Sequence, residues 1–479
     1  MRHTLRLPEN AERALALGSV LMMAALALAC NLPGLASETA QPEPITGGGT
    51  PPPTPEQGPP VEATVIALGG VEGTIRPLLG VNAGPVGIRE RDTDITAGYQ
   101  AVGVNSVRTH DYYGPLDMAT MYPDQSASPD DPASYDFEVS DEVFRAIIAG
   151  GFEPYFRLGD SWSNASDFPP ADPRHPTEPD HWVRAAVEVV RHYNDPALWG
   201  GSYVRRVEIW NEPDGRFWDA SMEEFFDLFA RTAFALKAEF PDLQVGGPGW
   251  TPAGYLAPRG QENVIAFLEY MSERDVPLDF LSWHVYSDDP DVSAEAAAFY
   301  RQLLDRYGYT ETESHLSEWN TELGGGNAPA LPTPIRAVYV TAIWINLQKE
   351  AVDAAHFYRG DMMFGPEGEG NQIASVFALW HEMSGYPERL SVTLDGEGEG
   401  VLYVLAGQNA EGATALLIAN PTDEVHLWRV ALPGGQPLEG HAISVREVTP
   451  EQSEAVEQEV EGPLIGIGPM STQLVIVSP

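Results

Sequence analysis

The fold is decided by the stretch Arg206-Val207-Glu208-Ile209-Trp210-Asn211-Glu212-Pro213 and the segment that follows it. The stretch is a short apolar run that ends in polar residues, which is typical of a strand buried in a parallel sheet. Ser221-Met222-Glu223-Glu224 then matches a capping box, the sequence signature of a helix start. Behind it, apolar residues recur at spacings of three and four and so predict an amphipathic helix. These are Phe225, Phe229, Ala233, Leu236 and Phe240. The stretch therefore predicts one β-α unit.

The same alternation of strand and helix occurs eight times within residues 76–386. The predicted strands are Leu78–Asn82, Val104–His110, Glu153–Leu158, Arg206–Asn211, Gln244–Gly247, Asp279–Tyr286, His315–Asn320 and Ala354–Tyr358. Eight such units predict an α/β fold, a TIM-type (β/α)8 barrel. A doubly wound open sheet is the alternative. It does not need eight units, and it usually carries a glycine-rich first turn, which this chain lacks.

Helical periodicity stops near Pro387, and the pattern changes to short apolar or alternating runs separated by Gly, Pro, Asp and Asn. This pattern predicts a C-terminal antiparallel β-sandwich over residues 387–479. Its expected strands are Val401–Ala406, Thr414–Asn420, Val425–Ala431, Ala442–Val448 and Gln473–Val477. A further apolar run, Val65–Leu68, lies within residues 62–75, before the barrel. We expect that segment to join the sandwich.

The first 61 residues are predicted to contain a targeting signal followed by a disordered linker. Residues 1–30 combine early arginines with an apolar run that is too short for a membrane span, as in a secretory signal. The run ends at Cys30, and a cysteine at this boundary resembles a bacterial lipoprotein signal, with Cys30 as the lipidation site. An ordinary signal with an incidental cysteine is the alternative. Residues 31–61, rich in Pro and Gly, predict a disordered linker. We therefore expect a secreted protein held by lipid at the outer face of a bacterial cell.

Composition narrows the range of functions. The 479 residues include 70 Asp and Glu against 27 Lys and Arg, a formal net charge of −43. Such a chain repels phosphate backbones, so nucleic acid is not an expected partner. The single cysteine excludes an intrachain disulfide and a four-cysteine metal site. No metal and no cofactor is predicted, and the oligomeric state stays open.

The chemistry is expected where barrel enzymes place it, at the carboxyl ends of the strands. The fourth predicted strand ends in Trp210-Asn211-Glu212-Pro213 and the seventh in Ser317-Glu318-Trp319-Asn320. Two glutamates at these ends face each other across a barrel mouth. A retaining glycosidase needs such a pair, one as acid/base and one as nucleophile. Glu212 and Glu318 are therefore the predicted catalytic residues, with a carbohydrate as the substrate.

With these motifs the chain resembles glycoside hydrolase family 39, the retaining β-xylosidases and α-L-iduronidases. The resemblance runs from about Leu78 to Gly385. It includes Val107–His110, Glu208–Asp214, Val245–Pro248, Asp279–Tyr286 and Ser317–Asn320. It implies that Glu212 is the acid/base and Glu318 the nucleophile. It also implies substrate-binding roles, with Asn211 on the sugar 2-hydroxyl, His110 on the terminal sugar, His284 beside Tyr286, and Tyr286 donating to Glu318.

Some positions depart from the family pattern and leave the sugar undecided. The eighth strand reads His356-Phe357-Tyr358-Arg359-Gly360-Asp361, and Tyr358 and Arg359 are expected to contact substrate. Arg108, Arg157 and Arg359 would suit a uronic acid carboxylate, unless they pair with neighbouring acidic residues. Aromatic side chains suit sugar faces, and one or more of four tryptophans at strand ends is expected to line the cleft. These are Trp162, Trp218, Trp250 and Trp319, of which Trp319 is a predicted site residue.

Alternative functions stay open at this stage. One is a non-catalytic carbohydrate-binding lipoprotein that has kept the cleft. Another is a glycosidase of the same family with a different specificity, such as an α-L-iduronidase-like enzyme, an arabinosidase or an exopolysaccharide hydrolase. A metal hydrolase is disfavoured because the chain has no His-Glu-x-x-His or comparable cluster.

Overall fold

The computed structural model describes residues 63–86, 93–161, 174–324, 330–435, 441–458, 460, 462 and 464–479. The predicted signal with Cys30, the whole of the predicted linker, and Trp162 lie outside these residues. None of the helices in the described ranges has both the length and the apolar character needed to span a bilayer.

Eight parallel strands close into a barrel, in the order in which they occur along the chain. They are β2 (Gly80–Asn82), β3 (Ser106–Arg108), β4 (Glu153–Leu158), β5 (Arg206–Ile209), β6 (Gln244–Trp250), β7 (Phe280–Tyr286), β8 (Glu313–Asn320) and β9 (Ala354–Phe357). Each overlaps one of the eight predicted strands, so the barrel prediction is confirmed. One close approach within it requires glycine: a Cβ atom on Gly246 would lie 2.1 Å from the carbonyl oxygen of Phe280 on the neighbouring strand.

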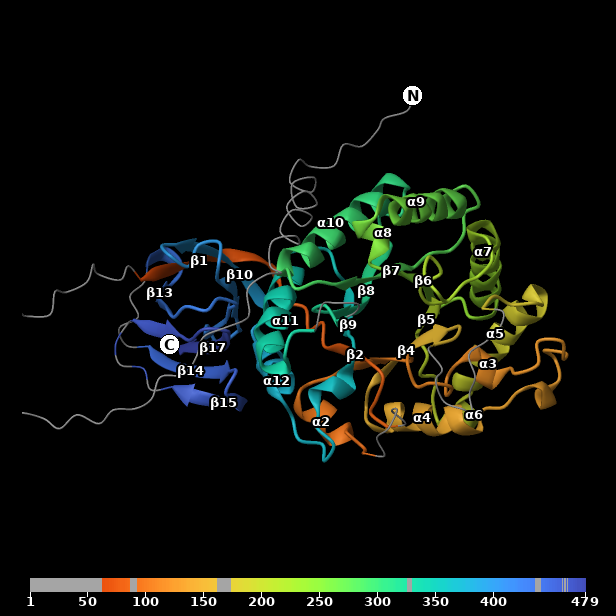
Figure 1. Cartoon of the computed structure of the whole chain (residues 1–479), viewed down its shortest axis with the longest axis horizontal. Helices are drawn as coiled ribbons and strands as arrows, with labels where there is room; N and C mark the ends of the chain where they lie inside the picture. Colours follow the sequence, from red (N-terminus) through yellow and green to blue (C-terminus); the bar gives the residue numbers. More distant parts are fainter. Residues whose placement is uncertain are drawn as a thin grey trace, which may run out of the picture. The chain divides into compact units, whose positions relative to one another are not determined.

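Helices surround the barrel strands (Figure 1). They are α2 (Thr96–Ala101), α3 (Met118–Met121), α4 (Glu138–Ala149), α5 (Pro179–Tyr193), α6 (Pro196–Trp199), α7 (Met222–Glu239), α8 (Ala253–Leu256), α9 (Pro258–Ser272), α10 (Pro290–Arg306), α11 (Thr333–Leu347) and α12 (Gln372–Met383). Short 3-10 helices lie at Pro132–Ser134, Gly360–Met363 and Pro433–Gly435. The predicted capping box starts α7, where both reciprocal hydrogen bonds between Ser221 and Glu224 are present. Its apolar face, including Phe225 and Phe229, is buried.

The C-terminal part is a nine-stranded, mostly antiparallel sheet with the strand order β15-β14-β17-β12-β11-β10-β1-β13-β16. The strands are β1 (Thr64–Thr74), β10 (Glu388–Asp395), β11 (Tyr403–Gln408), β12 (Thr414–Asn420), β13 (His426–Ala431), β14 (Ala442–Thr449), β15 (Gln452–Gln458), β16 (Ile465–Ile467) and β17 (Ser471–Ser478). Residues from most of these strands share one apolar core around Trp428. The predicted two-layer sandwich is thus one continuous sheet curled about its own core, and β1 lies in it between β10 and β13.

Three strands of this sheet were not predicted, for physical reasons. In β15 every side chain is at least partly exposed, so its sequence has no apolar alternation. The strand β10 buries a single side chain, Leu390. The strand β16 is three residues long, too short for a pattern. Backbone pairing with neighbouring strands, rather than side-chain burial, holds β10 and β15 extended, whereas β16 buries Ile465 and Ile467 in the core of the sheet.

The sheet packs against the last two helices of the barrel. Helix α11 contacts β11, β12 and β17, and α12 contacts β12, β14, β15 and β17. Polar links cross the same boundary, for instance from Arg446 on β14 to Glu382 on α12. The sheet therefore supports α11 and α12, the helices that follow β8 and β9. Glu318 lies on β8.

Candidate active site

The two predicted catalytic glutamates come from opposite sides of the barrel mouth. Glu318 lies near the end of β8, and Glu212 follows β5 by three residues. The backbone at Glu212 is left-handed, with φ of 48°, and its amide donates to the carbonyl of Gly249 at 3.0 Å. Left-handed backbone at a glutamate is strained and persists only where its surroundings hold it, as happens at functional sites.

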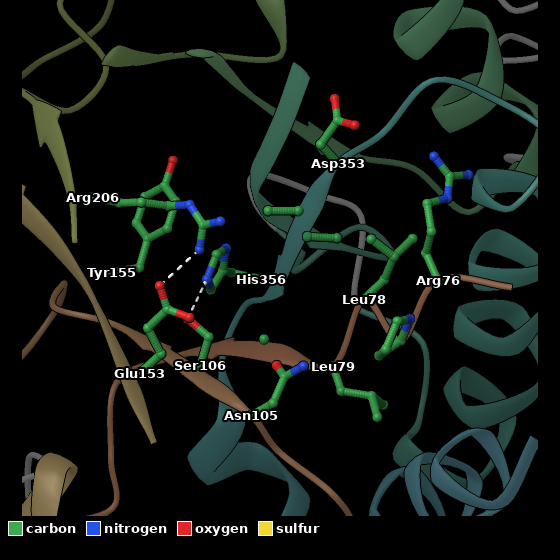
Figure 2. Close-up of a pocket in the computed structure, with 14 residues that line it drawn as sticks. Arg76, Leu78, Leu79, Asn105, Ser106, Glu153, Tyr155, Arg206, Asp353 and His356 are labelled. Carbon is green, nitrogen blue, oxygen red and sulfur yellow. Dashed lines mark hydrogen bonds and ion pairs between the residues drawn. The ribbon is translucent and has the colours of Figure 1, made fainter. Parts of the chain in front are cut away.

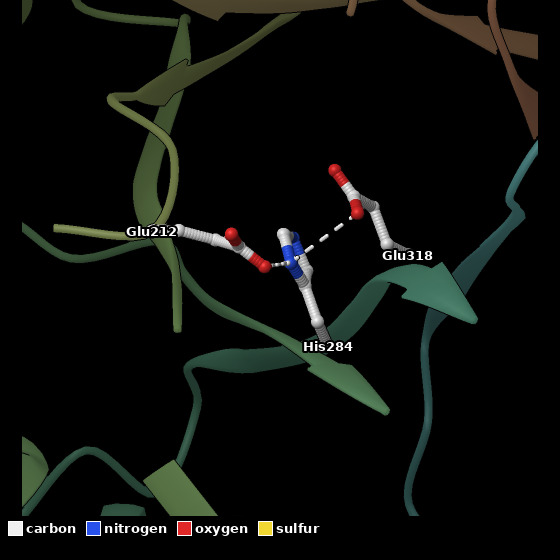
Figure 3. A group of neighbouring side chains, drawn as sticks. All are labelled: Glu212, His284 and Glu318. Atoms are coloured by element: carbon white, nitrogen blue, oxygen red, sulfur yellow. Dashed lines mark hydrogen bonds and ion pairs between the residues drawn. The ribbon is translucent and has the colours of Figure 1, made fainter. Parts of the chain in front are cut away.

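His284 of β7 stands between the two glutamates (Figure 3). Its Nδ1 atom lies 2.8 Å from Oε1 of Glu212 and 3.5 Å from Oε2 of Glu318. One carboxylate oxygen of each glutamate lies within 4.8 Å of the other. A separation of about 5 Å is that of retaining glycosidases, whereas inverting enzymes leave room for a water at roughly 6.5 Å or more. The geometry favours a nucleophile and an acid/base acting on one anomeric carbon.

A fully buried arginine, Arg108 of β3, organises the site from below. Its Nη1 donates to Glu318 at 2.6 Å and to Asn82 at 2.9 Å, and its Nε donates to Glu208 at 2.6 Å. Its Nη2 donates to the side-chain oxygen of Asn211 at 2.6 Å. One guanidinium thus positions the predicted nucleophile and the predicted 2-hydroxyl ligand together.

The environment of Glu212 keeps it protonated. Burial, followed by the negative charge of Asp214, raises its pKa to about 8. Its hydrogen-bond partner His284 is neutral at pH 7, because burial lowers the pKa of that imidazole to about 4. A protonated carboxyl with no cation in contact is suited to donate a proton to a leaving oxygen.

Glu318 experiences a different balance. Burial raises its pKa above the ordinary value, while the nearby Arg108 and the hydroxyl of Tyr286 act in the opposite direction. Tyr286 donates to Oε2 at 2.6 Å, as the resemblance implied, and Arg108 pairs with Oε1. Since Glu318 alone of the two has a cation in contact, the negative charge of the pair rests on it.

The structure brings most of the predicted substrate-binding residues to this centre. Nε2 of His110 lies 3.4 Å from Oε1 of Glu318. The amide nitrogen of Asn211 is buried and has no partner among the described residues, so it is available to a ligand. Tyr358 places its ring 5.9 Å from that of Tyr286, and its hydroxyl donates to Asp111.

Two predicted contact residues point elsewhere. The ring of Trp319 is fully buried and packs against Phe357 and Trp380, so its contacts are those of a core side chain. Arg359 pairs with both oxygens of Asp361, at 2.6 and 3.0 Å, and its Nη1 donates to Tyr113. Among the other tryptophans expected at the cleft, Trp250 is fully buried in the core and Trp218 is 8% exposed.

The three arginines considered for a sugar carboxylate all have acidic partners. Arg108 pairs with Glu208 and Glu318, and Arg359 pairs with Asp361. Arg157 pairs with Asp117 at 2.5 Å. The pairing alternative therefore holds for each of them, and none is a free cation for a uronic acid.

Sequence reasoning missed two acidic residues at this centre. Glu208 was part of the recognised stretch but received no role, and Asp111 was not singled out. The available signal for Glu208 was its charge within an otherwise apolar buried strand, since such a side chain needs a partner in the interior. No local pattern marks Asp111, because its partner Tyr358 lies 247 residues away in the chain.

A separate cavity of about 230 Å³ lies at the opposite end of the barrel strands. Figure 2 shows its polar wall, where Arg206 pairs with Glu153 and His356 contacts Ser106. These residues belong to the amino-terminal parts of their strands or to the segment before β2, and barrel chemistry occurs at the other end. This floor cavity is therefore not the active site.

Comparison with known proteins agrees with the geometry. The family model for glycosyl hydrolases family 39 matches residues 81–356. A β-xylosidase of Geobacillus stearothermophilus is 27% identical over 237 residues, which are 44% of this chain and 45% of that relative. The chain thus spans less than half of the length of this curated relative.

Two solved structures share the fold. A glucosidase from Croceicoccus marinus superimposes with a TM-score of 0.69 at 24% identity, covering 87% of this chain and 99% of that one. A monomeric β-xylosidase from Caulobacter crescentus gives a TM-score of 0.63 at 18% identity, covering 87% and 99%. With the family model matching more than half of the chain, and with the paired glutamates just after β5 and on β8, the chain belongs to glycosyl hydrolases family 39.

Proposed function

We propose that this protein is a retaining glycoside hydrolase that cleaves O-glycosidic bonds of oligo- or polysaccharides by double displacement, with β-xylosidase-like specificity. The observation that carries the proposal is the carboxylate pair, with oxygens within 4.8 Å and opposite electrostatic surroundings. The similarity to the β-xylosidase of Geobacillus stearothermophilus supports a xyloside as substrate.

In the first step, the ionised Glu318 attacks the anomeric carbon. Glu212 gives its proton to the leaving oxygen as the glycosidic bond breaks, and a glycosyl ester of Glu318 forms. Asn211, held by Arg108, offers its free amide to the 2-hydroxyl. In the second step Glu212, now a carboxylate, takes a proton from water. The water oxygen attacks the same carbon, and Glu318 leaves as a carboxylate.

A non-catalytic sugar-binding protein is less well supported. Sugar binding alone does not need a carboxyl group with a raised pKa, such as that of Glu212. Nor does it need a second carboxylate within 4.8 Å of the first that is paired with an arginine, as Glu318 is. An α-L-iduronidase-like specificity is also disfavoured, because the arginines of the site are already paired with acidic residues.

We further propose that the protein is secreted and anchored at the outer face of a bacterial cell through lipid on Cys30. The support is the sequence alone: the short apolar run that ends at this cysteine and the Pro- and Gly-rich residues after it. A sugar polymer outside the cell is a substrate that such a location makes accessible.

The first prediction concerns stereochemistry. Proton NMR of the earliest products from a nitrophenyl xyloside should show the same anomeric configuration as the substrate, because two inversions at one carbon restore it. Early release of the opposite anomer would reject the double displacement.

The second prediction separates the roles of the two glutamates. Glu318→Ala should lower kcat by roughly 10⁴-fold or more, and any glycosyl azide that it forms with added azide should have the anomeric configuration opposite to that of the substrate. Glu212→Ala should be rescued in part by azide, which yields a glycosyl azide, and by substrates with good leaving groups. Glu313→Gln, at the other end of the same strand, is the matched control and should stay active. A glycosyl azide of retained configuration from the Glu318 variant, together with one of inverted configuration from the Glu212 variant, would exchange the roles.

The third prediction is a pH dependence. Glu212 acts in its protonated form, and its pKa is raised to about 8, so kcat/KM should be maintained below that pH and fall as the pH rises through about 8. Removing the charge of Asp214 with Asp214→Asn should move this limb to lower pH. The exposed Glu223→Gln should leave it unchanged. An unmoved limb in the Asp214 variant would contradict this origin of the raised pKa.

The fourth prediction tests the anchor. Bacterial cells that express the chain and are fed a palmitate analogue should incorporate the label, and Cys30→Ala should abolish it. Absence of label, or label that survives the substitution, would refute lipidation at Cys30 and leave the proposed catalysis untouched.

A further inference from the structure

Several buried polar atoms around the two glutamates have no hydrogen-bond partner among the described residues. Two belong to residues with a proposed part in the reaction, namely Nδ2 of Asn211 and Nε2 of His284. Others belong to residues with no assigned part: Oδ1 of Asp111, and Nε and Nη1 of Arg157. Buried polar atoms are rarely left unsatisfied in folded proteins, so a cluster of them beside a reacting centre marks places for ligand atoms.

Asp111 lies close to the nucleophile and is linked to it on two sides. On one side, Nε2 of His110 is 3.4 Å from Oε1 of Glu318 and 3.5 Å from Oδ1 of Asp111. On the other side, Tyr286 donates to Glu318 and Tyr358 donates to Asp111, with the two tyrosine rings 5.9 Å apart. The two carboxylates therefore border the same part of the cleft.

Arg157 reaches the same part of the cleft from β4. In the pairing of β3 with β4, Arg108 lies opposite Tyr155, and beyond that pair the amide of Arg157 donates to the hydroxyl of Thr109 at 2.9 Å. Its Nη2 donates to Asp117 at 2.5 Å, and Asp117 is itself held by the amide and hydroxyl of Ser161. This contact fixes the guanidinium, which is fully buried, and leaves its Nε and Nη1 without partners. A rigid donor group and a rigid acceptor group are thus presented side by side.

The charges around this pair indicate what it can bind. Arg157 pairs with Asp117 and also interacts electrostatically with Asp111 and Asp160, and Arg359 is already neutralised by Asp361. A sugar carboxylate would satisfy Arg157 but would face the charge of Asp111 in a site with little water. A hydroxyl group donates one hydrogen bond and accepts two, so it can satisfy Asp111 and Arg157 at once.

We propose that Asp111 and Arg157 form a recognition site for hydroxyl groups of the bound sugar beyond its 2-position, and that the sugar selected is neutral. The proposal rests on the proposed glycosidase function for the identity of the ligand and on the unpartnered atoms for the place. Asn211 then binds the 2-hydroxyl, next to the reacting carbon. Asp111 and Arg157 together bind a hydroxyl farther round the sugar ring. Neither residue takes part in bond making or breaking.

The test compares hydroxyl discrimination in matched variants of the full chain. Nitrophenyl β-xyloside and its 2-, 3- and 4-deoxy forms are the substrates, and the readout is the ratio of kcat/KM with and without each hydroxyl. The wild type should discriminate at the 3- or 4-position by roughly 10²-fold or more. Asp111→Asn and Arg157→Lys should reduce that ratio about tenfold or more and leave the 2-deoxy ratio unchanged. Asparagine keeps the shape of Asp111 and tolerates its φ of 64°.

Two controls make the outcome specific. Arg206→Gln removes a partly exposed arginine at the floor of the barrel and should change none of the ratios. Calorimetric titration of Glu318→Ala, alone and combined with Asp111→Asn, with methyl β-xyloside and methyl β-glucuronide measures binding without turnover. The xyloside should bind more tightly than the glucuronide, and Asp111→Asn should weaken xyloside binding.

The results separate this inference from the proposed function. If Asp111→Asn and Arg157→Lys both turn over substrate with unaltered kcat/KM ratios for the 3- and 4-deoxy forms, the inference is overturned. The proposed glycosidase function is then unaffected. Binding that depends on Asp111 without turnover in the wild type would support the site and reject the enzyme. Tighter binding of the glucuronide, or xyloside binding that ignores Asp111, would overturn the inference.

Discussion

The contact on which the rest of the site depends is the buried ion-pair network of Arg108. A guanidinium with no exposed surface is costly unless every donor is paired. Here the acceptors lie on β2, on β8, on β5 and just after β5; they are Asn82, Glu318, Glu208 and Asn211. The barrel must therefore close in the correct register before the charge of Arg108 is paired. Folding and the assembly of the catalytic centre are therefore one event at this residue, and Glu208, which never faces substrate, is part of it.

The same network explains how two glutamates of equal intrinsic acidity take opposite roles. Both are desolvated, and desolvation raises the pKa of each. Only Glu318 has a cation within hydrogen-bond distance, because Arg108 approaches from below on the β8 side. Glu212 has instead a neutral imidazole and the added charge of Asp214. Position around the barrel, and not residue type, assigns acid and nucleophile.

Much of the fold could be predicted from the sequence because barrel strands are buried on both faces and so are read as apolar runs. All eight strands from β2 to β9 were recovered in this way, with boundaries that differ by a few residues. The method failed where that physical basis was missing. The edge strand β15 is exposed on both faces, so it has no apolar pattern. The ring of Trp319 packs against Trp380 of α12 and not in the cleft. It points outwards because side chains alternate along β8 next to the shift in its register with β9.

By itself the sequence determined the barrel, the β-rich C-terminal part and the two glutamates, because periodicity and strand-end motifs are local properties of the chain. Which cation meets which carboxylate was decided only by the tertiary structure. In the sequence, Arg108, Arg157 and Arg359 are alike as cations near strand ends. In the structure, Arg108 organises the nucleophile, Arg157 has donors without partners near Asp111, and Arg359 is neutralised by Asp361. Ion pairs join residues far apart in the chain, and their strength depends on distance and burial, which sequence spacing does not contain.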